Sequence, residues 1–156
     1  MSAALVRIAR PLIGILESLA PLADLGVRLW VAKFFWDSGL SKIYIDGGFP
    51  FVHVNPTTIT LFQTEYHVPL LAPVVAAYLG TAVELIFPAL LAVGLAGRLA
   101  AAVLFVFNII AVVSYPGLEE FGIAQHELYG TLLLLPLLRG PGKISFDHFI
   151  RRRYLP

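Results

Sequence analysis

The sequence contains no cysteine. This absence excludes disulfide bonds, thiolate metal sites and dithiol redox chemistry on the chain. Charged residues are also scarce, at 13% of 156 residues, whereas 58% of the residues are hydrophobic. A soluble domain of this composition would expose large apolar patches to water, whereas lipid solvates such surfaces. We therefore expect one integral membrane domain over residues 1–156, in which any redox work uses a bound cofactor, a quinone or a partner.

Four apolar segments are long enough to cross a bilayer, which takes roughly 17–25 helical residues. They cover residues 22–40, 70–95, 99–115 and 121–138. The sequence therefore predicts an all-α fold, an integral membrane four-helix bundle. Before the first span, residues 5–19 form either a helix lying on the membrane surface or a disordered tail. On the second span, small residues that permit close helix approach share one face with a carboxylate: Ala77, Gly80, Thr81, Glu84 and Pro88.

The connections between spans carry turn and capping signals. The segment Gly94-Leu-Ala-Gly-Arg98 is a tight turn, so the second and third spans form an antiparallel hairpin. In the long connection between the first two spans, Asn55-Pro56 is typical of an N-cap followed by proline at the first helical position. The sequence thus predicts a short extracytoplasmic helix from Pro56 to about Tyr66.

The basic residues predict the orientation. Of the eleven Lys and Arg residues, eight fall on one side of a four-span topology: Arg7, Arg10, Arg98, Arg139, Lys143, Arg151, Arg152 and Arg153. Lys42 falls on the other side. The positive-inside rule therefore places the N- and C-termini in the cytoplasm. The net charge is only +1, so we expect the lipid bilayer and no nucleic acid as a partner.

Glu84 lies near the middle of the second span. A carboxylate at that depth costs several kcal/mol unless it is protonated, paired or hydrated. Counting about 1.5 Å per residue places one polar residue of each span at a similar depth, roughly 15–17 Å from the cytoplasmic end. These residues are Lys33, Glu84, Asn108 and Tyr129, with Arg28 somewhat closer to the cytoplasm. The five residues form a candidate polar layer inside the bundle.

Two interpretations of this layer remain open. In the first, Glu84 forms an ion pair with Arg28 or Lys33 that fixes the helix register. In the second, Glu84 exchanges protons with a bound redox molecule or contacts a polar headgroup, so the layer is a candidate proton-exchange site. Asn108 is explained most simply by an interhelical hydrogen bond, and Tyr129 by packing with a satisfied hydroxyl.

Three histidines, His53, His67 and His126, fall on the outer side of the predicted topology. Imidazoles at one membrane face are candidate ligands for a transition metal or a haem. No two of them have the tight spacing of metal ligands, so histidines without a metal are the simpler explanation. The sequence contains no phosphate-binding loop, nucleophile elbow or HExxH motif.

Taken together, these landmarks resemble the DoxX family of small four-helix bacterial membrane proteins. The matching residues and segments are Arg28, Ser38-Gly-Leu-Ser-Lys42, Thr60-Leu-Phe-Gln-Thr-Glu-Tyr-His-Val-Pro69, Glu84, Gly94-Leu-Ala-Gly-Arg98 and Gly140-Pro-Gly-Lys-Ile-Ser-Phe-Asp147. The resemblance implies a multi-pass protein of the bacterial cytoplasmic membrane that belongs to a redox system and interacts with quinone or an oxidoreductase partner. The alternatives are a non-catalytic membrane scaffold and a copper-related stress protein that uses the outer histidines. The resemblance implies no particular reaction and leaves oligomer formation open.

The last of these segments also has a local physical interpretation. Gly140-Pro-Gly142 stops the fourth helix, and Ser145 or Asp147 can cap a following short helix. That helix carries Arg151–Arg153, which would anchor it to anionic headgroups or dock a partner.

Overall fold

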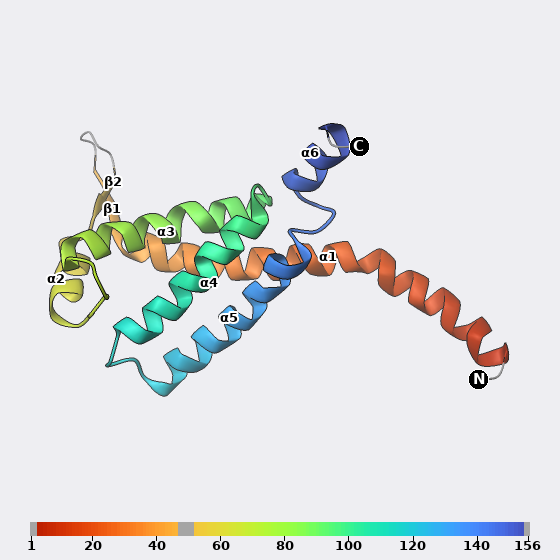
Figure 1. Ribbon diagram of the computed structural model, residues 1–156, viewed down its shortest axis with the longest axis horizontal. Helices are drawn as coiled ribbons and strands as arrows, with labels where there is room; N and C mark the ends of the chain where they lie inside the picture. The colour runs from red at the N-terminus through yellow and green to blue at the C-terminus, as the bar shows by residue number, and fades with distance from the viewer. Residues whose placement is uncertain (1–2, 47–51, 155–156) are drawn as a thin grey trace.

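The computed structural model of the chain describes residues 3–46 and 52–154. This part of the chain is mostly helical, as predicted. The helices are α1 (Ala3–Ser41), α2 (Pro56–Thr64), α3 (Pro73–Val93), α4 (Gly97–Ser114), α5 (Glu120–Arg139) and α6 (Phe146–Tyr154) (Figure 1). A short antiparallel hairpin, which the sequence analysis did not predict, connects α1 to α2. Its strands are β1 (Ile43–Ile45) and β2 (Val52–Val54).

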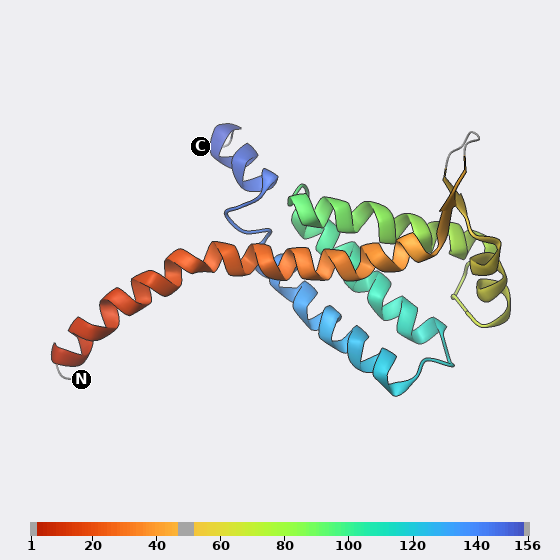
Figure 2. The same ribbon diagram turned by 180° about the vertical axis from the view of Figure 1, so that it is seen from behind.

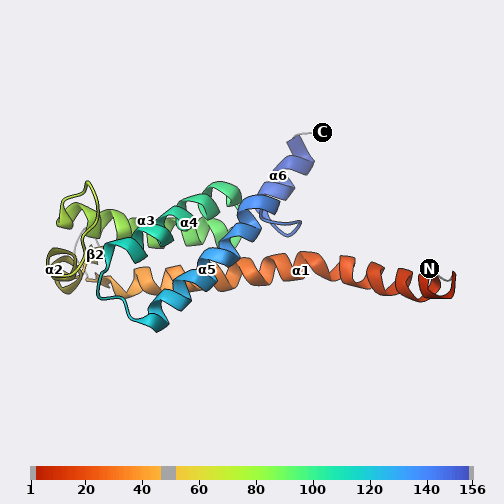
Figure 3. The same cartoon turned by 60° about the horizontal axis from the view of Figure 1, so that its bottom comes forward.

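Each of the four long helices packs against two of the others. Helix α3 contacts α1 and α4, and α5 contacts α4 and α1 (Figure 2). Helices α1 and α4 run in one direction, and α3 and α5 run in the other (Figure 1). As a result, the α3–α4 turn, the end of α5 and the start of α6 gather at one end of the molecule. The β-hairpin, α2 and the α4–α5 connection lie at the other end (Figure 3).

The predicted second and third spans correspond to α3 and α4. Within the described residues, these two helices are long and apolar enough to cross a membrane. Helix α3 also exposes large apolar side chains, as expected of a surface covered by lipid: Val74, Val75, Tyr78, Leu79 and Ile86. Helices α1 and α5 contain the predicted first and fourth spans and are long enough, but their composition does not meet the same criterion.

Helix α1 differs from its prediction. Neither a separate surface helix over residues 5–19 nor a disordered tail precedes the span, because one helix runs from Ala3 to Ser41. Within this helix the hydroxyl of Ser18 donates to the carbonyl of Ile15, one turn earlier, at 2.6 Å. Pro11 lies inside the helix, as does Pro21; interior prolines commonly bend a helix. The N-terminal part of α1 bends and projects well beyond the other helices (Figures 1 and 3).

Two local predictions are confirmed. The side chain of Asn55 caps α2 by accepting a hydrogen bond from the amide of Thr57 at 3.0 Å, with Pro56 at the start of the helix. Gly94 ends α3 with φ of 71°, a left-handed conformation that glycine adopts without steric cost. The chain then turns directly into α4, which gives the expected antiparallel hairpin.

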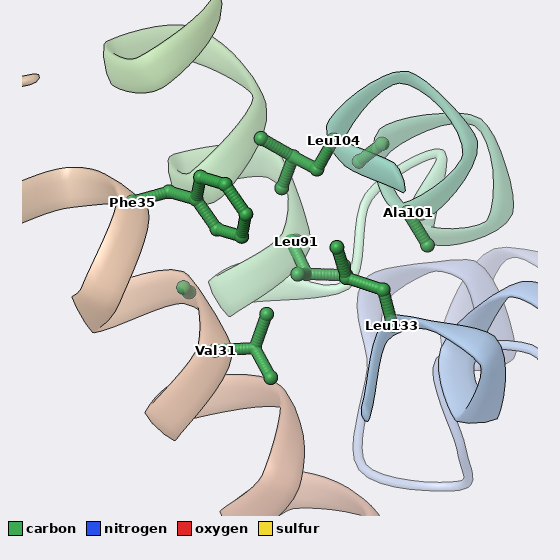
Figure 4. Close-up of a cluster of buried hydrophobic side chains, with 8 residues drawn as sticks. Val31, Phe35, Leu91, Ala101, Leu104 and Leu133 are labelled. Atoms are coloured by element: carbon green, nitrogen blue, oxygen red, sulfur yellow. The ribbon is translucent and has the colours of Figure 1, made fainter. Parts of the chain in front are cut away.

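The four long helices share one apolar core. Its fully buried members are Val31, Ala32, Phe35, Leu91, Ala100, Ala101, Leu104 and Leu133, which come from α1, α3, α4 and α5 (Figure 4). The small face predicted on the second span is buried throughout: Ala77, Gly80, Thr81, Glu84 and Pro88. Gly39 of α1 lies directly against this face of α3. A Cβ at Gly39 would lie only 3.0 Å from the backbone oxygen of Glu84. The contact between α1 and α3 therefore depends on a glycine.

This contact gives a stability prediction. Replacement Gly39→Ala forces α1 away from α3 and should lower the free energy of unfolding by about 1–3 kcal/mol. Gly26, on the same helix, has nothing within 4 Å of the position of an added Cβ. The control Gly26→Ala should therefore cause no loss and a gain of up to about 1 kcal/mol from helix propensity. Thermal unfolding of both variants in the same detergent tests this difference, and equal unfolding temperatures would contradict the packing described.

Candidate functional site

Glu84 forms a buried ion pair with Lys42. The residue lies on α3 with 5% of its surface exposed, and the Lys42 ammonium lies 2.6 Å from its Oε2. The other carboxylate oxygen, Oε1, accepts a hydrogen bond from the hydroxyl of Ser38 at 3.0 Å. Lys42 also donates to the same hydroxyl oxygen at 2.8 Å. The three side chains therefore form one connected polar cluster between α3 and the end of α1.

The backbone holds Lys42 in this position. The residue follows directly after the last turn of α1, and its carbonyl accepts a hydrogen bond from the amide of Asn55 at 2.8 Å. This bond ties the end of α1 to the start of α2 across the β-hairpin. The backbone at Lys42 is thus ordered by the fold, so only the side chain has to lose conformational freedom when the pair forms.

The predicted ion pair of Glu84 with Arg28 or Lys33 is wrong. Lys33 instead forms an exposed ion pair with Asp37, one turn along α1. The sequence prediction rested on how deep each residue lies along its span, and it did not consider which face of the helix the residue occupies. Ser38 is five residues from Lys33, which places it about 140° around α1 on another face. The sequence analysis did not select Ser38 and Lys42 as site residues, although their spacing of four residues at a helix end was a usable signal.

Arg28 lies at the opposite end of the molecule and binds backbone. The residue is 2% exposed, and its guanidinium donates to the carbonyls of Pro141 and Ile144, the latter at 2.7 Å. Both carbonyls belong to the segment between α5 and α6. The buried cation is therefore used to hold the C-terminal segment against α1.

Asp147 completes the attachment of this segment. Its two carboxylate oxygens accept hydrogen bonds from the amides of Ala96 and Gly97, at 2.8 and 2.7 Å, at the start of α4. The negative charge there is favourable because the N-terminal end of a helix carries a partial positive charge. Of the two predicted caps of α6, Ser145 takes that role by accepting from the amide of His148, whereas Asp147 caps α4.

Asn108 forms the predicted interhelical hydrogen bond. Its amide nitrogen donates to the backbone oxygen of His126 at 2.9 Å, and its side-chain oxygen lies 2.7 Å from Nδ1 of the same histidine. Gly130 leaves room for the amide, since a Cβ there would lie 2.9 Å from the Asn108 nitrogen. Asn108 therefore joins α4 to α5 and does not reach Glu84.

Tyr129 lies on α5 and faces α1. Its ring stacks on Phe34, and its hydroxyl accepts a hydrogen bond from Trp30 Nε1 at 3.1 Å. The five residues of the predicted layer thus do not form one layer. Arg28 binds the C-terminal segment and Glu84 pairs with Lys42, whereas Asn108 and Tyr129 make their contacts at α5. Lys33 lies near Tyr129 but not near Glu84.

A cavity of about 390 Å³ lies beside this aromatic pair, between α1 and α5. The residues that line it are Trp30, Lys33, Phe34, Asp37, Ser38 and Tyr129. Ser38 is the connection between the two parts of the site, because it borders the cavity and is also hydrogen-bonded to Glu84. A ligand in the cavity would therefore be one hydroxyl group away from the buried carboxylate.

Stacked aromatic rings lie at the same end of the molecule as the ion pair. Phe62 stacks on Tyr66, and Tyr66 stacks on Tyr115, whose hydroxyl donates to Glu65 at 2.9 Å. Burial raises the pKa of Tyr66 above its ordinary value, and the nearby charge of Glu84 raises it further. Tyr66 thus remains a neutral phenol at the pH values at which tyrosine is ordinarily protonated.

The three histidines that the sequence predicts on the outer side do not converge. His53 pairs with Asp46 at 3.3 Å, the ring of His67 lies 3.2 Å from the carbonyl of Glu65, and His126 is bonded to Asn108. In residues 3–46 and 52–154, no three His, Cys, Asp or Glu side chains are grouped so that they could hold a metal ion. The described structure therefore gives no support to a metal site built from these histidines.

Comparison with known proteins identifies the family of this chain. The sequence model of the DoxX family matches residues 23–117. The matched segment includes Ser38, Lys42 and Glu84, whereas α5 and α6 lie beyond it. No curated protein and no solved structure matches the chain.

A double-mutant cycle tests the ion pair. Replacements Glu84→Gln and Lys42→Met should each lower the free energy of unfolding by on the order of 3 kcal/mol, because each leaves the other charge buried without a partner. The double variant should lose much less than the sum of the two. The matched control is the exposed pair Lys33–Asp37, with side chains 74% and 55% exposed. Its double variant Lys33→Met/Asp37→Asn should cost less than about 1 kcal/mol. Additive losses at Glu84 and Lys42 would show that the two residues do not interact.

Proposed function

The chain belongs to the DoxX family of membrane proteins, and from its geometry we propose that it is a membrane component of a redox system. In this proposal it binds a quinone in the cavity between α1 and α5 and works with an oxidoreductase partner. The family resemblance predicted from the sequence motifs is confirmed by the match over residues 23–117. The observation that carries the proposal is the double role of Ser38, which lines the cavity and is bonded to Glu84.

The proposal includes a topology. Helices α1, α3, α4 and α5 form a four-helix bundle across the bacterial cytoplasmic membrane, with both termini in the cytoplasm. The clustering of basic residues supports this orientation, since Arg98, Arg139 and Lys143 lie together around the end at which α3 turns into α4. Helix α2 and the β-hairpin would then lie on the outer side.

The residues around the cavity fit a quinone headgroup. Trp30, Phe34 and Tyr129 provide aromatic surface against which a flat ring can pack. Lys33 provides a hydrogen-bond donor for a carbonyl oxygen, and the Ser38 hydroxyl borders the same space. The volume of about 390 Å³ lies within the range of small-molecule sites, roughly 300–1,000 Å³.

The exposed ion pair on α1 also supports a polar ligand. Lys33 and Asp37 are exposed although they lie in the predicted first span. Ionised side chains that face lipid directly are costly, and in membrane proteins they commonly face a cavity or a partner. A polar headgroup in the cavity would lie beside this pair and lower that cost.

A quinone supplies reversible two-electron chemistry, with electrons delivered by the oxidoreductase partner and protons taken up on reduction. Glu84 is the proton-exchanging group of this chain. In the described state, the Ser38 hydroxyl donates a hydrogen bond to the Glu84 carboxylate. When Glu84 gains a proton, the direction of this hydrogen bond reverses, and the Ser38 hydroxyl can donate into the cavity. Lys42 compensates the charge of the carboxylate between these states, which is the role that the sequence analysis gave to Arg28 or Lys33.

A second candidate function is a non-catalytic membrane scaffold. The observation that favours it is that Lys42 and Ser38 already satisfy Glu84 within the chain. In this account the buried charges fix the positions of the helices, and a partner protein carries the chemistry. Replacement of Glu84 would then lower stability without any effect on ligand chemistry.

Fluorescence quenching of Trp30 measures quinone binding directly. The chain has two tryptophans, so a Trp36→Phe background leaves Trp30, which lines the cavity, as the single reporter. A short-chain benzoquinone should quench this fluorescence saturably, and Tyr129→Leu should weaken its binding by about tenfold, through loss of a stacking surface worth roughly 1 kcal/mol or more. Val113→Leu, on the exposed face of α4, is a control that should leave binding unchanged.

The proton path is tested in the same background. Ser38→Ala and Glu84→Gln should bind quinone within a few fold of the parent, yet slow its reduction by a chemical reductant by about 10²-fold or more. Unchanged reduction in both variants would contradict the proposed role of Glu84. Absence of saturable quenching in the parent would instead favour the scaffold.

A further inference from the structure

A second cavity, of about 620 Å³, lies where the α3–α4 turn meets the end of α5 and the segment leading into α6. This place is at the Arg28 end of the molecule, away from Glu84 and Ser38. Four cationic side chains contribute to the lining of the cavity: Arg98, Arg139, Lys143 and Arg151. The site described above uses none of them.

The negative charges at this cavity are already engaged. Both carboxylate oxygens of Asp147 accept hydrogen bonds from the amides at the start of α4. Asp24 lies 4.0 Å from Arg139. With His148 neutral, four cations therefore face two carboxylates, which is a net charge of +2 in the lining.

Two of the cations have no side-chain partner in the part of the chain that the structure describes. Among the described residues, the side chains of Lys143 and Arg151 form no hydrogen bond or ion pair, and both residues are exposed. Arg98 makes one long hydrogen bond, 3.4 Å, to the carbonyl of Leu138. These donors converge on one hollow and are free to bind an anion. Guanidinium and ammonium groups in such an arrangement match the oxygens of a phosphate.

We propose that this cavity binds the phosphate of an anionic phospholipid. Phosphate chemistry alone could come from a free ion or from a headgroup, and the surroundings favour the headgroup. Leu99 and Ile150 line the cavity beside the cations and are exposed, at 60% and 40%. On α6, Phe146 and Phe149 also expose their rings. Apolar surface next to a basic hollow suits a ligand with a charged head and acyl chains.

The proposal assigns a specific function to the C-terminal segment. Arg28 and Asp147 hold this segment in place, and the held segment then contributes Lys143 and Arg151 to the cavity. The bound lipid would connect α4, α5 and α6 at the membrane surface. This role does not depend on quinone binding at the other site.

Native mass spectrometry of the full chain in detergent tests the site. The purified protein is titrated with diphosphatidylglycerol and, separately, with phosphatidylcholine. We expect preferential retention of the anionic lipid, and at least about a tenfold loss of its affinity in Lys143→Gln/Arg151→Gln. The matched control, Arg152→Gln/Arg153→Gln, removes the same charge from α6 at residues that do not line the cavity, and should stay within about twofold of the parent. Charge-preserving Lys143→Arg/Arg151→Lys should also retain binding.

Two results would overturn the proposal. Equal losses in the two glutamine variants would mean that diffuse surface charge attracts the lipid. Inorganic phosphate that displaces diphosphatidylglycerol at equal concentration would assign the cavity to a free anion and not to a lipid headgroup. Because neither variant changes Glu84, Ser38 or the quinone cavity, quinone binding measured on the same proteins distinguishes failure here from failure of the proposed function.

Discussion

The buried ion pair between Glu84 and Lys42 is the interaction on which the arrangement of α1 and α3 depends. A carboxylate inside an apolar helix needs a partner, and the partner that the fold supplies lies directly after the end of α1. Since Lys42 must reach Glu84, the last turn of α1 is held against the middle of α3, and Gly39 permits that approach. The same geometry brings Ser38 to the carboxylate on one side and to the cavity on the other. Helix register and the proposed chemistry therefore follow from one contact.

The charges at the other end of the molecule have a different role. Arg28 binds backbone carbonyls of the segment after α5, and Asp147 binds backbone amides at the start of α4. Both side chains satisfy groups that a turn or a helix end leaves unpaired. Together they attach the C-terminal segment to α1 and to the α3–α4 turn. The buried cation in the first span is thus explained by structure, whereas the buried carboxylate in the second span is bonded to Ser38, which borders the cavity.

Much of the fold could be predicted from the sequence, because apolar runs and capping residues act locally. The positions of α3 and α4, the turn at Gly94 and the cap at Asn55 all follow from such signals. The continuity of α1 did not, since Pro11 and Pro21 are residues that commonly interrupt a helix, yet both lie inside this one. The candidate site was predicted in part: Glu84 was identified as the residue to explain, but its partner was not. The partner of Glu84 depends on which face of α1 a residue occupies and on the hairpin that places Lys42. Neither can be deduced from how deep a residue lies along a span.

The central claim, that Glu84 exchanges a proton with the quinone cavity, is tested most directly by infrared difference spectroscopy. Quinone-loaded protein in lipid nanodiscs is compared before and after reduction, with the parent chain and Glu84→Gln measured in parallel. The account predicts that reduction changes the protonation of one carboxyl group, seen as a carboxylic-acid band that is absent in Glu84→Gln and altered in Ser38→Ala. A difference spectrum with no carboxyl signal, or with the same signal in Glu84→Gln, would contradict it.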